Sequence, residues 1–442
     1  MDFTFSSAPA FRDKLPPAAD VVIIGGGIIG ISTAWYLNKR GKSVVICEKG
    51  RIACEQSSRN WGWLRVTGRD SDEIPIAIES LECWAEMDRE TQTDLGFKAR
   101  QGVAALIDNE EEMAGFTEWA ELAKTYGLDT RMLSAAEINE NFGSTAGDWK
   151  GGIITPSDAR AEPFKAVPGI AKTLQGRGVT IRENCAVRTL EKKGGKLDGV
   201  MTEDGFIKAG AVVCAAGGWS SLFLSNSGVK FPQLVVQGTV ARTEKAPEIH
   251  SGAFGLQDVF LRRRQDGGYT VATGLTTHII GAGSFRNALT FRPSLASASE
   301  IGIKLGRDPT QKPLFGRKWT SDQTSPFETN RVLNPPPETK ALKKMRARFD
   351  KRLPELAGLA FAQSWSGMID ATPDVVPVMD EISGVPGLFL ASGFSGHGFG
   401  IGPGAGRVMA DLVCGNAPGH DLDRFRFSRF SDGSNMRPGP AI

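Results

Sequence analysis

A short apolar strand that ends in a glycine-rich turn constrains the fold of this chain more than any other segment. Residues 21–24 read Val-Val-Ile-Ile, and glycines follow at positions 25, 27 and 30. A β-branched apolar run of this kind is typical of a strand buried on both faces. The G-x-G-x-x-G spacing assigns Gly25 to the tight turn, Gly27 to close approach of a pyrophosphate and Gly30 to helix–strand packing. The segment therefore predicts the start of a dinucleotide-binding unit.

The residues after the turn supply the other parts of such a unit. We expect a helix from about residue 30 to residue 38, a stop at Gly41 and a second strand over residues 43–47. The helix would aim free N–H groups and its positive end at the phosphates. Glu48 follows the second strand, where a carboxylate suits a free ribose 2′-hydroxyl and repels a 2′-phosphate. The sequence thus favours FAD or NAD over NADP.

Length, charge and cysteine usage narrow the class of protein. At 442 residues the chain exceeds what one hydrophobic core usually serves, so two domains are expected. A net charge of +2 gives no long-range attraction to nucleic acid. The six cysteines form no C-x-x-C pair and the four histidines are far apart in sequence, which favours a protein with reduced thiols and no metal site. Because no signal pattern or apolar run of transmembrane length is present, a cytoplasmic location is expected.

Two further glycine-rich segments lie far along the chain. Residues 211–216 read as a buried strand, and Gly217, Gly218 and Trp219 follow it. Residues 388–404 read as a strand and a glycine loop, with a helix from about residue 403 to residue 413. The N-terminus of that helix is suited to stabilising negative charge on a reduced flavin. Since the sequence has no second complete G-x-G-x-x-G unit for NADPH, FAD is favoured, and the electrons are expected to come directly from an organic substrate.

Several motifs extend the FAD interpretation over most of the chain. They are residues 57–60 (Ser-Ser-Arg-Asn), 151–156 with Glu162 and Pro163, 216–220 (Ala-Gly-Gly-Trp-Ser), 365–374 with Pro377, and 393–398 (Gly-Phe-Ser-Gly-His-Gly). Together with the N-terminal fingerprint, they resemble the FAD-dependent amine and amino-acid oxidoreductases that include D-amino-acid dehydrogenase, glycine oxidase and sarcosine oxidase. The resemblance runs from residue 20 to about residue 415.

The resemblance implies where the cofactor lies. In that family the Ser-Ser-x-x segment lies against the flavin, the last glycine loop lies at the pyrimidine edge of the ring, and the strand that holds Val187 contacts the adenine. The residues expected to bind FAD are Gly25, Gly27, Ile28, Ile29, Gly30, Glu48, Lys49, Ser57, Ser58, Arg59, Asn60, Val187, Ala216, Gly217, Trp219, Gly393, Ser395, Gly396, His397, Gly398 and Ile401.

Three positions depart from the family pattern. Ile369 stands where glycine-oxidase-like members have a carboxylate-binding arginine, and Gly400 stands where sarcosine-oxidase-like members have a lysine. Some relatives attach the flavin through a cysteine near the Thr-Pro-Asp stretch at 372–374, and no cysteine occurs here between Cys214 and Cys414. We therefore expect non-covalent FAD and a substrate other than glycine, sarcosine or a small D-amino acid.

Candidate substrate-binding residues follow the flavin-facing motif. Arg65 is suited to hold a carboxylate or to sit over the ring, the alternative being an ion pair on the surface. Trp61 and Trp63 alternate along the same segment. One of them is expected to line the pocket and the other to pack in the core.

Other candidates come from later segments. Arg262 and Arg264 share one face of a predicted strand, where they either bind an anionic substrate or lie at a solvated edge. His397 either contacts the flavin or supports its loop. Asp370 and Asp374 are expected to form turns rather than an acid–base pair.

The resemblance implies oxidation of the C–N bond of an amino acid or secondary amine. Hydride passes to flavin N5, water hydrolyses the imine, and O2 or a quinone accepts the electrons. A homo- or hetero-oligomer is compatible with this scheme. Such chemistry depends on orientation and exclusion of water more than on a dedicated base. Two alternatives remain. One is a flavin-dependent 2-hydroxy-acid oxidoreductase, which needs a base near N5. The other is a non-catalytic flavoprotein subunit of a hetero-oligomeric dehydrogenase.

The predicted fold class is α/β, or α+β overall. It combines a Rossmann-like FAD-binding domain with a discontinuous, mixed-sheet substrate-binding domain. Residues 20–71, 150–225 and 365–430 are assigned to the first domain, residues 72–149 and 226–364 to the second, and residues 1–19 to an N-terminal arm. The pocket is expected to open where the two domains meet.

Overall fold

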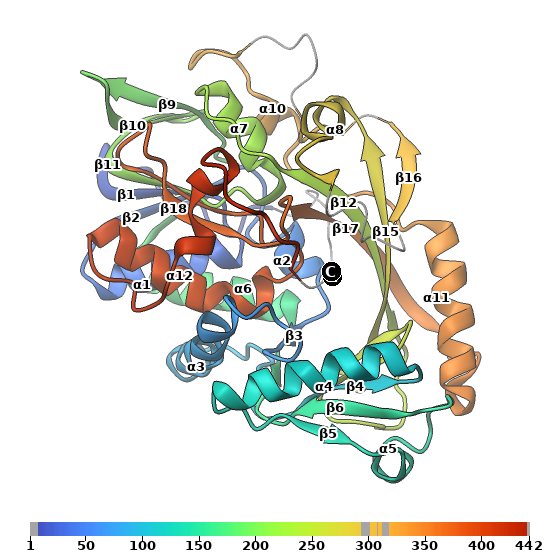
Figure 1. Cartoon of the computed structure of the whole chain (residues 1–442). Coiled ribbons are helices and arrows are strands. Elements are labelled where there is room, and N and C mark those ends of the chain that lie inside the picture. The colour runs from blue at the N-terminus through green and yellow to red at the C-terminus, as the bar shows by residue number, and fades with distance from the viewer. Residues whose placement is uncertain (1–7, 293–300, 307, 312–317, 440–442) are drawn as a thin grey trace.

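Two large sheets organise the computed structural model, which describes residues 8–292, 301–306, 308–311 and 318–439 (Figure 1). In the eight-stranded sheet the main path runs β18–β19–β11–β1–β2–β8, and β10 joins β11 to β9. Its strands are β1 (Ala18–Ile24), β2 (Val44–Glu48), β8 (Thr180–Glu183), β9 (Val187–Lys193), β10 (Lys196–Thr202), β11 (Gly205–Cys214), β18 (Val378–Glu381) and β19 (Leu388–Ser392). The central strands β1, β2, β8, β11 and β19 are parallel.

Strand β1 is buried on both faces, as its sequence predicts. Val21 and Ile23 belong to one hydrophobic core, and Val22 and Ile24 belong to another on the opposite face. The first core includes side chains from a layer of helices on that face (Figure 1). These helices are α1 (Ile28–Lys39), α3 (Ile74–Glu90), α6 (Pro163–Gly176) and α12 (Gly398–Cys414). The predicted strand–helix–strand order at the N-terminus is confirmed, with α1 beginning two residues earlier than expected.

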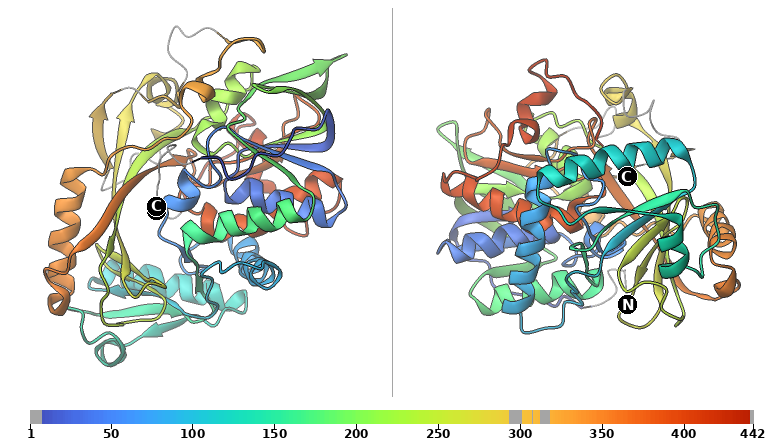
Figure 2. Two further views of the ribbon diagram at one scale, coloured as in Figure 1. Left: turned by 180° about the vertical axis from the view of Figure 1, so that it is seen from behind. Right: turned by 60° about the horizontal axis from the view of Figure 1, so that its bottom comes forward.

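The nine-stranded sheet stands beside the first and is mixed. Its path runs β17–β12–β15–β14–β13–β4–β6–β5, with β16 paired to β15. Its strands are β4 (Val103–Ile107), β5 (Arg131–Leu133), β6 (Gly151–Thr155), β12 (Leu234–Thr243), β13 (Ala253–Leu256), β14 (Phe260–Arg263), β15 (Tyr269–Ile280), β16 (Ile301–Leu305) and β17 (Phe361–Ala371). The two views in Figure 2 show that this sheet and the helix-covered sheet face one another across the middle of the molecule.

The remaining elements cover these sheets. Helix α11 (Thr339–Arg352) packs Met345 and Phe349 against the nine-stranded sheet. The other α-helices in the described ranges are α2 (Gln56–Arg59), α4 (Glu110–Thr125), α5 (Ala135–Asn141), α7 (Ser220–Asn226), α8 (Ala282–Asn287) and α10 (Pro326–Thr329). A small sheet pairs β3 (Trp63–Leu64) with β7 (Ala159–Arg160). No helix in the described ranges is both long and apolar enough to cross a membrane.

The sheet pairing departs from the predicted division at two strands. Strands β6 and β17 pair within the nine-stranded sheet, although residues 150–225 and 365–430 were assigned to the FAD-binding domain. Glycine and β-branched residues in these strands resemble those of a cofactor-binding segment, and only their partners in space decide the sheet. The two-domain division itself stays a prediction.

Helix α12 begins at Gly398, earlier than the predicted start near residue 403. In the sequence its glycines predict a loop, but in the structure two of them allow close packing of α12 against other helices. A Cβ on Gly406 would lie 2.4 Å from Cβ of Ser32 in α1, and one on Gly404 would lie 2.6 Å from the carbonyl oxygen of Ile76 in α3. Contacts with other helices therefore outweigh the low helix propensity of glycine here.

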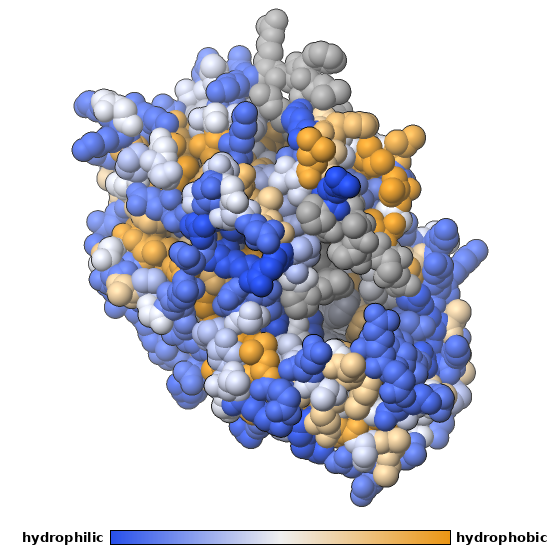
Figure 3. Space-filling view, in the orientation of Figure 1, coloured by the Kyte–Doolittle hydropathy of each residue, from blue (hydrophilic) through white to orange (hydrophobic). Residues whose placement is uncertain are grey.

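Four exposed apolar side chains lie close to α8 and β16 among the described residues. Phe285, Leu289, Ile303 and Leu305 are 71%, 87%, 71% and 81% exposed. The orange atoms at the upper right of Figure 3 lie over these elements, beside residues drawn in grey.

The close contact of α1 with β1 gives the first prediction. A Cβ on Gly30 would lie 2.1 Å from the carbonyl oxygen of Gly25, so Gly30→Ala must displace backbone. We expect it to lower the free energy of unfolding by about 1–3 kcal/mol, as overpacking does. Urea unfolding measures this loss. In the control Gly176→Ala, the added Cβ has no neighbour within 4 Å. Equal stability of the two variants would contradict the packing role of Gly30.

Candidate functional site

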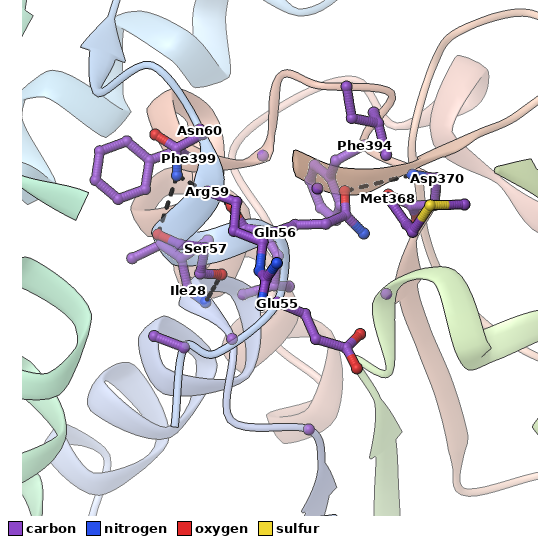
Figure 4. A pocket seen from close by; sticks show the side chains of 18 of the residues that line it. Ile28, Glu55, Gln56, Ser57, Arg59, Asn60, Met368, Asp370, Phe394 and Phe399 are labelled. Carbon is purple, nitrogen blue, oxygen red and sulfur yellow. Dashed lines mark hydrogen bonds between the residues drawn. The ribbon is translucent and has the colours of Figure 1, made fainter. Parts of the chain in front are cut away.

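The turn between β1 and α1 forms one end of a large cavity. Gly25 has φ +110°, and a Cβ there would lie 2.4 Å from the carbonyl oxygen of Ala215. The backbone N–H of Ile28, the first residue of α1, donates to Ser57 Oγ at 2.9 Å (Figure 4). The turn thus brings the N-terminus of α1 against the Ser-Ser-Arg-Asn motif.

Glu48 lies at the same end of the cavity. Its Oε2 accepts a hydrogen bond from the Gly26 N–H at 2.8 Å, and its Oε1 accepts one from the Gly50 N–H at 2.7 Å. Burial raises the pKa of this carboxyl to about 7 despite these bonds. The acid at the end of β2 is therefore held by backbone donors at the position where the fingerprint predicts a ribose.

The cavity lies between the two sheets and encloses about 240 Å³ available to the centres of water-sized molecules. Sixteen of the predicted cofactor-binding residues line it: Gly25, Gly27, Ile28, Ile29, Glu48, Lys49, Ser57, Arg59, Asn60, Val187, Ala216, Gly217, Trp219, Gly396, His397 and Gly398. The other five, Gly30, Ser58, Gly393, Ser395 and Ile401, do not line it. Segments that are far apart in the sequence thus meet at one cavity, although binding by each residue stays a prediction.

Asp370 corrects one expectation about this region. It lies inside strand β17, not in a turn, and it lines the cavity. Its carboxylate accepts a hydrogen bond from the Gly393 N–H at 2.8 Å and one from Gln233 at 3.0 Å, and Gln56 Oε1 accepts from its backbone N–H (Figure 4). Burial raises the pKa of Asp370. The Asp370 carboxylate therefore holds the backbone of the C-terminal glycine loop through the N–H group of Gly393.

The predicted alternation of Trp61 and Trp63 is wrong, because both line the cavity. Gly62 between them has φ +78°, so the segment turns instead of extending, and β3 begins only at Trp63. Trp61 stacks on Phe260 with ring centroids 5.1 Å apart and meets Trp63 edge-on at 5.7 Å. Together the rings form an aromatic wall.

The prediction that Arg262 and Arg264 bind substrate is not supported by their positions, because neither lines the cavity. Arg262 is 1% exposed, and both its terminal nitrogens bond to the Glu162 carboxylate, at 2.9 and 3.1 Å. Its Nε donates to the Trp61 carbonyl at 2.6 Å. Arg264 pairs with Asp266 at 2.9 Å. The shared face is correct, but acidic partners occupy these guanidinium groups. Arg262 instead supports the backbone of the aromatic wall.

Arg65 does line the cavity, and so does Arg69, which the sequence reasoning missed. Arg65 Nη1 donates to the Thr67 carbonyl at 2.9 Å. Arg69 Nη1 is buried without a hydrogen-bond partner. Burial and the proximity of Arg69 lower the pKa of Arg65 to about 9, and burial also lowers that of Arg69. Within the described parts of the chain, neither guanidinium has a carboxylate at ion-pair distance.

Asp158 holds the segment that carries these arginines. Its carboxylate accepts hydrogen bonds from the Val66 N–H at 2.7 Å, the Thr67 N–H at 3.3 Å and the Thr67 hydroxyl at 2.6 Å. Asp158 is fully buried, and burial raises its pKa to about 6 against these bonds. No local pattern marks this residue in the sequence, because its partners lie ninety-one and ninety-two positions away.

His397 lies just before α12 and is 3% exposed. Its Nδ1 is 3.0 Å from Oε2 of Glu73, which is completely buried. The other ring nitrogen, Nε2, is buried without a hydrogen-bond partner. Gly400, at the position of the family lysine, also lines the cavity.

Comparison with known proteins now adds to this geometry. The family model described as FAD dependent oxidoreductase matches residues 20–412. The chain belongs to the FAD-dependent oxidoreductase family. FAD is therefore its cofactor, and the predicted family and Rossmann-like fold are confirmed. None of the described residues forms a metal-binding cluster of His, Cys, Asp or Glu.

Several members and structures resemble the chain along its length. It is 24% identical to 4-methylaminobutanoate oxidase (formaldehyde-forming) of Paenarthrobacter nicotinovorans, covering 96% of this chain but only 47% of that relative. It is 24% identical to sarcosine oxidase subunit beta of Rhizobium meliloti, covering 96% of this chain and 92% of the relative. The structure of L-amino acid deaminase from Proteus myxofaciens in complex with anthranilate matches with a TM-score of 0.90 at 30% identity, covering 97% of both chains.

The cavity of this FAD-dependent oxidoreductase suits its cofactor. Gly25 and Gly27 leave room beside the N-terminus of α1, where backbone donors suit a pyrophosphate. Glu48 offers carboxylate oxygens at the same end, and Val187 and Trp219 are among the side chains that line the wall. When bound, FAD supplies the acceptor for a hydride. The protein's part is to hold the substrate, orient it and exclude water.

Buried Asp158 gives a prediction about pH. Its pKa is raised from 3.8 to about 6 in the folded protein, so the native state retains a proton that the unfolded state has lost in that interval. The stability it contributes is present below about pH 4 and is lost as the pH rises through about 6, by up to ~1.4 kcal/mol per pH unit. Asp158→Asn should remove this slope in urea unfolding, whereas Asp148→Asn, at a side chain 90% exposed, should keep it. An unchanged slope in Asp158→Asn would contradict the assignment.

Proposed function

We propose that this chain oxidises the C–N bond of an amino acid, or of an amine that bears a carboxylate, to an imine that water then hydrolyses. The observation that supports this most strongly is the pair Arg65 and Arg69, which line the cavity with no carboxylate at ion-pair distance among the described residues. A buried charge without a counter-ion is unfavourable by several kcal/mol. An anionic ligand between these guanidinium groups and the flavin would remove that penalty. Carboxylate is the anion common to amino-acid substrates.

The activities of the similar proteins support the same class of substrate. Sarcosine, 4-methylaminobutanoate and L-amino acids each carry both nitrogen and a carboxylate. Arg65 and Arg69 take the place of the arginine and the lysine that other family members carry at the positions of Ile369 and Gly400. The expectation that the substrate differs from glycine, sarcosine and small D-amino acids therefore stands as part of the proposal.

Each wall of the cavity has a role in this scheme. Arg65 and Arg69 hold the carboxylate, and the aromatic wall of Trp61 and Trp63 packs against the hydrocarbon part of the substrate. Thr273 Oγ1 is buried in the lining without a partner and offers a further hydrogen bond. These contacts orient the α-hydrogen and exclude water, which is where such a reaction gains its rate.

Several finer points belong to the same proposal. FAD is bound non-covalently, and O2 or a quinone accepts the electrons. The site is cytoplasmic, and a homo- or hetero-oligomer is compatible with the resemblance to a sarcosine oxidase subunit. Acid precipitation should release the whole flavin into the supernatant if no covalent bond is present.

The test is anaerobic bleaching of the purified yellow protein by a panel of compounds. The panel contains D- and L-amino acids, N-methyl amino acids, secondary amines with two carboxylates, and 2-hydroxy acids. We expect rapid bleaching by a nitrogen compound that bears a carboxylate, with an imine or carbonyl product. Bleaching only by 2-hydroxy acids would contradict the proposal and favour the alternative, a flavin-dependent 2-hydroxy-acid oxidoreductase. A flavin that no compound bleaches would favour a non-catalytic subunit.

A further inference from the structure

The orientation of His397 is set by Glu73. Burial opposes ionisation of Glu73, while the guanidinium groups of Arg69 and Arg424 lower its pKa and favour the charged carboxylate. An ionised carboxylate accepts hydrogen bonds and has none to donate. The ring nitrogen at 3.0 Å from it, Nδ1, must therefore carry the proton. In the neutral ring this leaves a free lone pair on Nε2.

The surroundings of His397 favour the neutral ring before a ligand binds. The charged groups that act on it are Glu73 from the start of α3 and Arg69 and Arg65 from the segment before that helix. Burial and the two arginines lower the pKa of His397, and Glu73 partly opposes them. His397 thus lines the cavity and has one buried, unpartnered ring nitrogen, and the Glu73 carboxylate on its other side can stabilise positive charge on the ring.

The polar groups of Arg65, Arg69 and His397 are complementary to a zwitterion. Arg65 and Arg69 are donors only, so they suit a carboxylate. Nε2 of His397 is an acceptor only, so it suits an N–H or O–H group. It is buried and unpartnered, which is unfavourable until a donor reaches it. An amino acid presents the two matching groups on one small molecule.

We propose that His397 is a catalytic base whose Nε2 removes a nitrogen-bound proton from the substrate, with Glu73 as its positioning residue. This step deepens the proposed function and rests on it. The substrate binds as an ammonium; one N–H bond breaks, its electron pair stays on nitrogen, and the proton forms a bond to Nε2. The free amine then has the lone pair that its oxidation to an imine requires. The proton leaves His397 to solvent after the product has dissociated.

The first test compares pH profiles of the holoenzyme. The limiting rate of anaerobic flavin reduction is measured with the panel compound that bleaches the wild type fastest, for His397→Asn and Glu73→Gln. We expect His397→Asn to be slower by about 10²–10⁴-fold near neutral pH. The deficit should shrink about tenfold per pH unit towards the amine's own pKa, because free amine needs no base. Glu73→Gln should shift the profile in the same direction.

A matched control is available outside the cavity. His420 Nε2 lies 2.6 Å from Glu79, so His420→Asn also removes a histidine–glutamate pair. It should leave the pH profile unchanged. FAD content and the flavin absorption spectrum show whether each variant is loaded. Parallel profiles for His397→Asn and wild type contradict the proposal whatever the absolute rate. If no nitrogen compound bleaches the wild type, the proposed function fails, and this step with it.

A second test needs no turnover and uses a variant only to assign a signal. The chain has four histidines, so ¹⁵N-histidine labelling gives few ring signals, and His397→Asn assigns one of them. 2-Aminoisobutyrate carries both charges but lacks an α-hydrogen, and 2-methylpropanoate differs only in lacking the amine. We expect the His397 ring to change from the neutral Nδ1–H form to imidazolium with the first compound alone. A ring that stays neutral with 2-aminoisobutyrate contradicts the proposal.

Discussion

The cost of burying positive charge governs this site. Arg65 and Arg69 lie at the cavity without a carboxylate at ion-pair distance among the described residues, and the segment must be held by other contacts. Asp158 provides three hydrogen bonds to it, and Gly68, with φ +70°, leaves room for the Arg65 guanidinium 3.2 Å from where a Cβ would be. Burying these charges is unfavourable in free energy, and binding of an anion removes this penalty.

The same segment links this charge to the rest of the fold. Glu73, which pairs with His397, directly precedes α3, and α3 packs against α12 through the glycines that make close contact possible. Donors for a carboxylate and an acceptor for an N–H group therefore belong to one rigid wall. The eight-stranded sheet places the nucleotide end of the cavity, and the nine-stranded sheet contributes its opposite side.

Much of the cofactor side was predictable because its signals are local. The spacing of Gly25, Gly27 and Gly30 encodes a turn, and Glu48 follows a strand directly. The substrate side was less predictable because its partners are distant. Strand alternation placed Arg262 and Arg264 on one face, but nothing in the sequence indicated Glu162 opposite them. Arg69, Glu73 and Asp158 carry no motif at all. Their role depends on segments that meet only in the folded chain.

The most direct test of the account is whether the arginines recognise a carboxylate. The measurement is the rate constant for anaerobic flavin reduction divided by the substrate Kd. It is made for the best amino acid of the panel and for the amine that lacks its carboxylate, in wild type and in Arg69→Met. The account predicts a preference for the carboxylate of about 10²-fold or more in the wild type, the effect of a buried charge-paired hydrogen bond, and a clear loss of it in the variant. Equal preference in both proteins would contradict the account.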